Sequence, residues 1–299
     1  MLPSAVTWAL DLDGVVWLAG RAIPGSAEAV AELRAAGERP LFLTNNSGPT
    51  VASHLASLAE VGIDCDERDL ATSAQAAASL VRSGARVAVV GDEGIREALR
   101  VRGVQLVRTD ESPEAIVVGR SVELDYWALA AAAAAIRSGA RFVAANADAT
   151  FPVGPQVTPD GTPEGPGPVP APDRLPPDGL LPGAGAVVAY IATASGRSAE
   201  VAGKPYEAMA ALVRQRVGTV DVVAGDQPDT DGLFARRVGA RFGLVLSGVT
   251  RRSDLPIDPA PDFVGDDLLS LVRNYLRTGR GRTGPRCHVR GFGQDVTFV

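Results

Sequence analysis

Cysteine and histidine are scarce in this chain, whose 299 residues contain two of each. Cys65 and Cys287 lie far apart and form no CxxC motif, so the sequence indicates neither a disulfide framework nor a cysteine-bound metal site. With His54 and His288 as the only histidines, we do not expect a histidine-based zinc site or a Ser-His-Asp triad. Any catalysis is therefore expected to depend on carboxylates.

Lysine is scarcer still. Of the 29 basic residues, Lys204 alone is a lysine, and it stands between glycine and proline in the stretch EVAGKPYEAM (200–209). A site that needs a compact ammonium on a flexible stem cannot use the planar guanidinium of arginine, which would explain why one lysine is kept. The alternative is a coding bias, because alanine, arginine, glycine and proline are all abundant. The composition leaves both explanations open.

The sequence also lacks the features of membrane and nucleic-acid-binding proteins. No uninterrupted apolar run reaches about 18 residues, and the first residues, MLPSAVTWALDLDG, have no signal-peptide pattern. A net charge of −6 does not favour nucleic acid or an anionic membrane as a partner. With 46% hydrophobic residues, the chain has the composition of about two globular domains, and we expect a cytoplasmic enzyme.

Short apolar runs alternate with helical patterns along the chain. The runs predict strands buried on both faces at residues 6–10, 40–44, 86–90, 115–119, 141–145, 220–225 and 241–246. The helical patterns lie at residues 26–37, 50–62, 125–139, 186–196, 206–218 and 230–240. This alternation predicts an α/β fold with parallel sheets.

Two segments do not fit this pattern. Residues 151–183 hold 11 of the 22 prolines, and we expect an extended or disordered Pro/Gly-rich excursion at 152–178. The tail from Arg277 to Arg290 has five arginines and is followed by DVTFV. We expect a solvated tail that ends in an edge strand rather than a phosphate-binding arm.

Acidic residues follow two of the predicted strands. In ALDLDGVVW, Asp11 and Asp13 stand at a strand end and can share a metal ion while doing different work. The pattern does not complete a calcium-binding loop, whereas a glycosyltransferase DxD motif stays an alternative. In VVAGDQPDTDG, Asp226 ends a strand and is followed by Asp229 and Asp231. A helix N-terminus attracts such acids, which explains Asp229 but not Asp226.

A third strand end carries hydroxyl and amide side chains. In LFLTNNSG, Thr44 ends a strand, and Asn45 and Asn46 follow before a helix. This arrangement suits a phosphate or an oxyanion, although the same residues are typical of an ordinary turn. Because open α/β sheets bind ligands at the carboxyl ends of their strands, these positions are candidates for a shared site.

The order DxD, Thr, Lys and GDxxxTD, each after an apolar strand, resembles the haloacid dehalogenase superfamily of phosphohydrolases. The stretches DLDGVVW, LFLTNNSG, VAGKP and GDQPDTD look most like its large-cap branch, which includes phosphoglycolate, glycerol-3-phosphate, 4-nitrophenyl and NagD-like phosphatases. The resemblance covers about residues 5–275. It implies a Rossmann-like parallel-sheet core, formed by residues 1–74 and 187–299, with a smaller α/β cap domain inserted at 75–186.

The resemblance also implies a role for each motif residue. Asp11 would be the nucleophile that forms an aspartyl-phosphate, and Asp13 would be the general acid and base. Mg²⁺ would bind Asp11, Asp226 and the backbone carbonyl of Asp13. Lys204 would stabilise the transferred charge, and Asp231 would orient Lys204 or a metal-bound water.

Substrate recognition is expected to involve both domains. By resemblance, Thr44 and the backbone N–H of Asn45, with Asn46 beside them, would bind the phosphoryl oxygens. In the cap segment AANADATFP, Asn146 and Asp148 would contact the rest of the substrate, although a turn explains them as well.

The expected substrate is a small phosphorylated metabolite, such as glycerol 3-phosphate, phosphoglycolate or a sugar phosphate. Analogy with relatives also implies a homodimer formed through the cap. Two other functions stay open: a non-catalytic or regulatory protein that binds a phosphate ligand on this scaffold, and a phosphotransferase.

Overall fold

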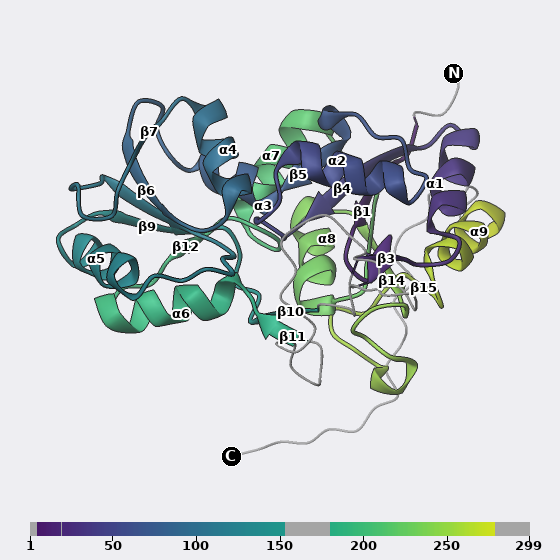
Figure 1. Ribbon diagram of the computed structural model, residues 1–299. Coiled ribbons are helices and arrows are strands. Elements are labelled where there is room, and N and C mark those ends of the chain that lie inside the picture. The colour runs from purple at the N-terminus through teal and green to yellow at the C-terminus, as the bar shows by residue number, and fades with distance from the viewer. Residues whose placement is uncertain (1–4, 19, 153–179, 279–299) are drawn as a thin grey trace, which may run out of the picture.

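The described residues form two parallel β-sheets with helices on both faces of each (Figure 1). The computed structural model describes residues 5–18, 20–152 and 180–278, and it confirms the predicted α/β fold. The proline-rich excursion after residue 152 and the arginine-rich tail after residue 278 lie outside the described residues. No helix within the described ranges combines the length and the apolar character that a membrane span requires.

The first sheet runs in the order β15-β14-β13-β1-β4-β5. In that order its strands are Phe263–Gly265, Arg241–Val245, Val222–Gly225, Thr7–Asp11, Arg39–Thr44 and Leu70–Thr72. Trp8 and Leu10 of β1 pack on one face, with α1, α2 and α9, whereas Ala9 packs on the other, with α7 and α8. Those helices span Ser26–Ala35, Val51–Glu60, Leu268–Thr278, Glu207–Val217 and Leu233–Val238. Burial on both faces explains why the strand is largely apolar.

The second sheet runs in the order β12-β9-β8-β6-β7. In that order its strands are Glu200–Val201, Arg141–Ala144, Ala115–Val118, Arg86–Val90 and Gln105–Val107. Helices α5 and α6 cover one face, and α3 and α4 cover the other. Those four helices span Tyr126–Arg137, Ala184–Ser195, Ser73–Ser79 and Glu93–Arg102.

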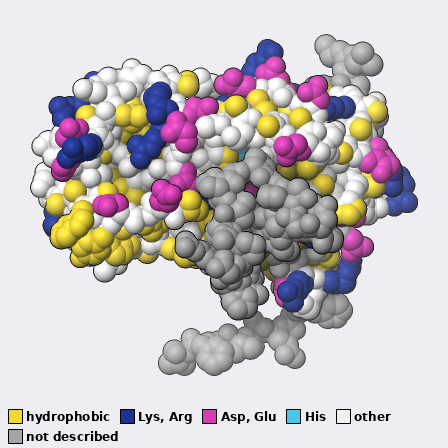
Figure 2. Space-filling view, in the orientation of Figure 1, with side chains coloured by type: hydrophobic (Ala, Val, Ile, Leu, Met, Phe, Trp, Pro, Cys, Tyr) yellow, Lys and Arg dark blue, Asp and Glu magenta, His cyan; other side chains and the backbone are white. Residues whose placement is uncertain are grey.

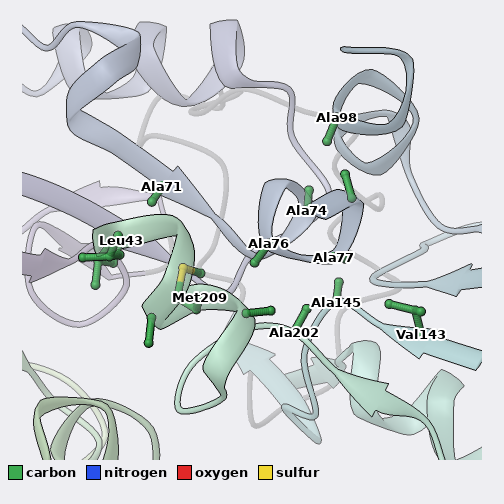
Figure 3. Packing of buried hydrophobic residues seen from close by; sticks show 14 of the residues in the cluster. Leu43, Ala71, Ala74, Ala76, Ala77, Ala98, Val143, Ala145, Ala202 and Met209 are labelled. Atoms are coloured by element: carbon green, nitrogen blue, oxygen red, sulfur yellow. The ribbon is translucent and has the colours of Figure 1, made fainter. Parts of the chain in front are cut away.

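A cluster of small side chains joins the two sheets (Figure 3). Helix α3 contributes much of it and contacts both α4, on the second sheet, and α7, on the first. The alanines labelled in Figure 3 are Ala71, Ala74, Ala76, Ala77, Ala98, Ala145 and Ala202. Because protein interiors are close-packed, side chains this small bring the backbones of the two sheets close together.

The chain stays with the second sheet beyond residue 187, through α6 and β12. The expected boundary at residue 187 falls inside α6, which packs on the second sheet. Strand β12 then pairs in parallel with β9, with Glu200 opposite Val143. Residues 187–201 therefore lie with the second sheet, because the apolar face of α6 is buried against it and β12 forms its backbone hydrogen bonds with β9.

Two antiparallel strand pairs and several short turns complete the described structure. Strands β2 (Trp17–Leu18) and β3 (Arg21–Ala22) form one hairpin. Strands β10 (Thr150–Pro152) and β11 (Leu180–Pro182) form a second antiparallel pair. Short helical turns occupy Glu67–Asp69, Pro228–Gly232 and Arg252–Asp254. The turn at Pro228–Gly232 has π-helical geometry and precedes α8, so the predicted helix at 230–240 is shorter than expected.

Candidate active site

The candidate site lies at the carboxyl ends of neighbouring strands of the first sheet. Asp11 is the last residue of β1, Thr44 is the last residue of β4, and Asp226 directly follows β13. Strand β1 pairs with both β4 and β13, so these ends are adjacent. Lys204 comes from the other sheet, a few residues after β12. The arrangement agrees with ligand binding at the carboxyl edge of an open α/β sheet.

Lys204 forms two buried ion pairs. Its Nζ lies 2.7 Å from Asp11 Oδ1 and 2.7 Å from Asp231 Oδ1, and its side chain is 2% exposed. Burial lowers the pKa of Lys204, but the Asp11 and Asp231 carboxylates outweigh burial and raise that pKa above its usual value. The side chain therefore stays a charged ammonium between two carboxylates.

Asp226 completes an acidic cluster that could hold a metal ion. Asp11, Asp226 and Asp231 each place one carboxylate oxygen within 4.8 Å of the others. Asp226 Oδ2 accepts a hydrogen bond from the Val249 N–H at 2.6 Å. Its buried Oδ1 has no hydrogen-bond partner among the described residues. Such an oxygen beside other carboxylates fits a divalent cation with hard oxygen ligands.

The charge of this cluster is not balanced by Lys204 alone. Burial and then the Asp231 charge raise the pKa of Asp226 to about 7. Burial also raises the pKa of Asp11, against the opposing effect of Lys204. Lys204 contacts two of the three buried carboxylates, Asp11 and Asp231. A divalent cation beside Asp226 would therefore favour the ionised forms of all three.

Two glycines make room for the Asp226 side chain. A Cβ on Gly14, whose φ is +81°, would lie 2.5 Å from Asp226 Oδ2, and one on Gly248 would lie 2.0 Å from it. Substitution of Gly14 would also place a side chain in a left-handed conformation that L-residues seldom adopt. The glycine of the DxDG motif is therefore required by close approach as well as by the turn.

Asp13 is held by a neighbouring indole. Its Oδ1 accepts a hydrogen bond from Trp17 Nε1 at 3.1 Å, and the residue is half-buried. Burial raises the pKa of Asp13, and the Trp17 hydrogen bond opposes that rise. A carboxyl group with a raised pKa suits a residue that gives up and regains a proton.

The loop after β4 orders the predicted phosphate-binding residues. Asn46 N–H donates to Thr44 Oγ1 at 2.9 Å, and Gly48 N–H donates to Asn46 Oδ1 at 3.2 Å. The Thr44 hydroxyl accepts in this turn, which leaves its own proton as a donor. The Asn46 side chain closes the turn, so it supports the loop rather than extending from it.

The structure brings the predicted cap residues to the same place. Asn146 Nδ2 donates to the Asn45 carbonyl at 2.5 Å, and Asn45 Nδ2 donates to Asp148 Oδ1 at 3.2 Å. Asp148 N–H in turn donates to Asn146 Oδ1 at 3.1 Å. All three therefore belong to one hydrogen-bond network around Asn45.

Comparison with known proteins decides the family. Residues 8–105 match the haloacid dehalogenase-like hydrolase family, and residues 201–271 match a related HAD-hydrolase-like family. The chain is 35% identical to D-glycerol 3-phosphate phosphatase of Mycobacterium tuberculosis, over 88% of this chain and 69% of that protein. It is 30% identical to acid sugar phosphatase of Staphylococcus haemolyticus, over 87% of this chain and 92% of that protein.

The chain belongs to the haloacid dehalogenase-like hydrolase family. The crystal structure of glycerol phosphate phosphatase from Mycobacterium tuberculosis in complex with magnesium has the same fold. Its TM-score is 0.76 and its sequence identity 34%, over 89% of this chain and 76% of that one. The family and the hydrolase class predicted from the sequence are thus confirmed.

Several residues of this haloacid dehalogenase-like site escaped sequence analysis. Ser247 Oγ donates to the Gly14 carbonyl at 2.7 Å, and Val249 N–H binds Asp226. Both belong to the SGV turn after β14, which is another strand end at the same edge of the sheet. The rule that open α/β sheets bind ligands at the carboxyl ends of their strands would therefore have identified them. Ser73 Oγ, which donates to the Asn45 carbonyl at 2.6 Å, and Trp17 carried no such signal.

Replacing Lys204 with arginine should cost at least about 10²-fold in kcat, because a larger planar group displaces one of the two carboxylates by about 1 Å. Lys204→Ala should be no better, since losing one electrostatic stabiliser costs on the order of 10²–10³. Turnover on one substrate is measured beside a melting curve that confirms folding. An arginine variant that keeps more than about half of the wild-type kcat would show that the lone lysine is an accident of composition.

Proposed function

We propose that this protein is a magnesium-dependent phosphatase that hydrolyses phosphate monoesters of small metabolites through a phosphorylated Asp11. The observation that supports this most directly is the buried Lys204 ammonium, shared by Asp11 and Asp231 beside the unpartnered oxygen of Asp226. Phosphoryl transfer requires positive charge, an in-line nucleophile and a proton donor at one place. Lys204 supplies the positive charge, Asp11 the nucleophile and Asp13 the proton donor.

Asp11 is the proposed nucleophile. Among the described residues, the Leu12 N–H and Lys204 Nζ bind Asp11, and both bind Oδ1. Oδ2 is left to attack phosphorus. In the first step an Asp11 O–P bond forms, the bond from phosphorus to the leaving oxygen breaks, and Asp13 gives that oxygen a proton. In the second step water attacks phosphorus and gives a proton to the Asp13 carboxylate. The bond between phosphorus and Asp11 breaks, and the Asp11 carboxylate leaves.

Magnesium would be held by Asp11, Asp226 and the backbone carbonyl of Asp13. The unpartnered Asp226 Oδ1 supports this assignment. When bound, the ion would offset charge on the phosphoryl oxygens. Asp231 remains ion-paired with Lys204 in both steps and holds the Lys204 ammonium in place. Thr44 donates its hydroxyl proton to a phosphoryl oxygen, and the Asn45 N–H binds another.

The second sheet and its helices form the proposed cap. Asn146 and Asp148 follow β9 at the edge that faces the catalytic residues, and their network with Asn45 links the two units. A cap over the site excludes water and restricts substrates to small molecules. The relatives named above are a D-glycerol 3-phosphate phosphatase and an acid sugar phosphatase. By analogy we assign glycerol 3-phosphate, phosphoglycolate or a sugar phosphate to this chain.

Chelation should abolish turnover of nitrophenyl phosphate, and added Mg²⁺ should restore it, because Asp226 Oδ1 then regains its partner. Excess Ca²⁺ should inhibit, since it takes higher and looser coordination than Mg²⁺. A circular-dichroism melt in EDTA shows whether the fold survives. Full activity in chelator would remove the metal from the proposed mechanism.

Asp13→Asn should lower kcat by on the order of 10²–10⁴, because the variant cannot protonate the leaving oxygen. The loss should be greater for alkyl phosphates, which are poor leaving groups, than for nitrophenyl phosphate. The exposed Asp229→Asn, a matched change nearby, should keep wild-type rates. Equal losses of Asp13→Asn on both substrates would rule out Asp13 as the general acid.

We also propose that two copies of the chain associate through α5 and α6. Each helix has 12 residues, and Arg137 is the only charged residue in their sequences. Tyr126, Trp127 and Tyr190 are 64%, 76% and 43% exposed. Figure 2 shows the hydrophobic side chains gathered over these helices at the lower left. A charge-depleted, aromatic surface is typical of the centre of a protein interface.

Light scattering at micromolar concentration should give a dimer mass for the wild type and a monomer mass for Trp127→Glu, because a buried carboxylate without a partner opposes association. Val101→Glu changes an 84% exposed residue on α4 and should leave the dimer intact. A monomeric wild type would exclude this association.

A further inference from the structure

Lys204 stands where the chain crosses from the second sheet to the first. Ala202 N–H donates to the Ala144 carbonyl at 2.9 Å, and Gly203 N–H donates to the Ala145 carbonyl at 2.7 Å. The pairing of β12 with β9 therefore continues to the residue before Lys204. The carboxylates that Lys204 binds, Asp11 and Asp231, belong to the first sheet. Something must hold its backbone against that sheet.

The Asn45 side chain makes that connection. Its Oδ1 accepts from the Lys204 N–H at 2.8 Å, and its Nδ2 donates to the Lys204 carbonyl at 3.2 Å. Asn45 is 8% exposed and directly follows β4 of the first sheet. One side-chain amide thus binds both the backbone N–H and the backbone carbonyl of Lys204. A Cβ on Gly203 would lie 2.5 Å from Asn45 Oδ1, so this contact also requires the glycine before Lys204.

The hydrogen-bonding capacity of this side chain is almost fully used by the protein. An asparagine amide has two N–H donors. One binds the Lys204 carbonyl, and the other binds Asp148 Oδ1 at 3.2 Å. No donor of the side chain is left for a substrate, whereas the backbone N–H of Asn45 can still bind a phosphoryl oxygen. The side chain of Asn45 therefore contacts the protein, whereas its backbone N–H is available to a substrate.

We propose that Asn45 is a positioning residue whose side-chain amide fixes the backbone of Lys204 against the first sheet, so that the ammonium stays between Asp11 and Asp231. The consequence for catalysis rests on the proposed function. Since Lys204 stabilises charge that develops during transfer, its displacement lowers kcat, whereas loss of a substrate contact raises KM. Asn45 supports catalysis without touching the reacting atoms through its side chain.

Two substitutions test this in the full-length protein with nitrophenyl phosphate. Asn45→Ala removes the side-chain contacts, whereas Asn45→Asp keeps the shape and the acceptor for Lys204 N–H but removes both donors. Each should lower kcat about 10- to 100-fold, the cost of misplacing a catalytic group by about 1 Å, with KM changed less than about threefold. Asn274→Ala and Asn274→Asp change an exposed asparagine on α9 and serve as matched controls. A raised KM with unchanged kcat would make Asn45 a substrate contact and overturn the proposal.

The lone lysine allows a second test that does not depend on turnover. Because Lys204 is the only lysine, protein labelled with ¹³Cε-lysine gives one side-chain signal by NMR. Both Asn45 variants should shift or broaden that signal, and both Asn274 variants should leave it unchanged. An unchanged signal in both Asn45 variants would overturn the positioning role. If the wild type hydrolyses no phosphate ester, the proposed function fails, and the NMR comparison alone decides the role of Asn45.

Discussion

The buried ammonium of Lys204 is the interaction on which the rest of the site depends. Asp11, Asp226 and Asp231 lie too close together to stay ionised in a buried place without compensating charge. Lys204 bonds directly to two of them, and a cation bound by the unpartnered Asp226 oxygen would offset the rest. Removing one member of such a set leaves buried charge without a partner, which costs far more than losing an exposed ion pair.

The need to place an ammonium among buried carboxylates explains much of the surrounding fold. The carboxylates come from the first sheet, but the ammonium follows the edge strand of the second, so the two sheets must meet closely. The alanines of α3 and its neighbours fill that junction. Gly14 and Gly248 leave room for the Asp226 side chain, and Gly203 leaves room for the Asn45 side chain. Small residues therefore line the junction where the two units contribute to one site.

The site residues at the carboxyl ends of the strands could be predicted from the sequence. The hydrogen bonds that join the two sheets could not. Apolar runs that end in polar residues identify strands of a parallel sheet, and Asp11, Thr44 and Asp226 follow from that pattern. The pairing of Asn45 with Lys204 joins residues 159 positions apart and has no periodic trace. The predicted boundary at residue 187 falls inside α6, because an apolar helix does not reveal from its sequence which sheet it covers. The roles assigned by resemblance remain predictions.

Trapping the phosphorylated protein tests the central claim most directly. Enzyme mixed with substrate and Mg²⁺ is quenched in acid during turnover and digested, and the peptide that contains Asp11 is analysed by mass spectrometry. We expect one phosphoryl group on Asp11, absent from Asp11→Asn and from enzyme quenched without substrate. Turnover with no phosphorylated Asp11 at any quench time, or with the phosphoryl group on another residue, would contradict the assignment.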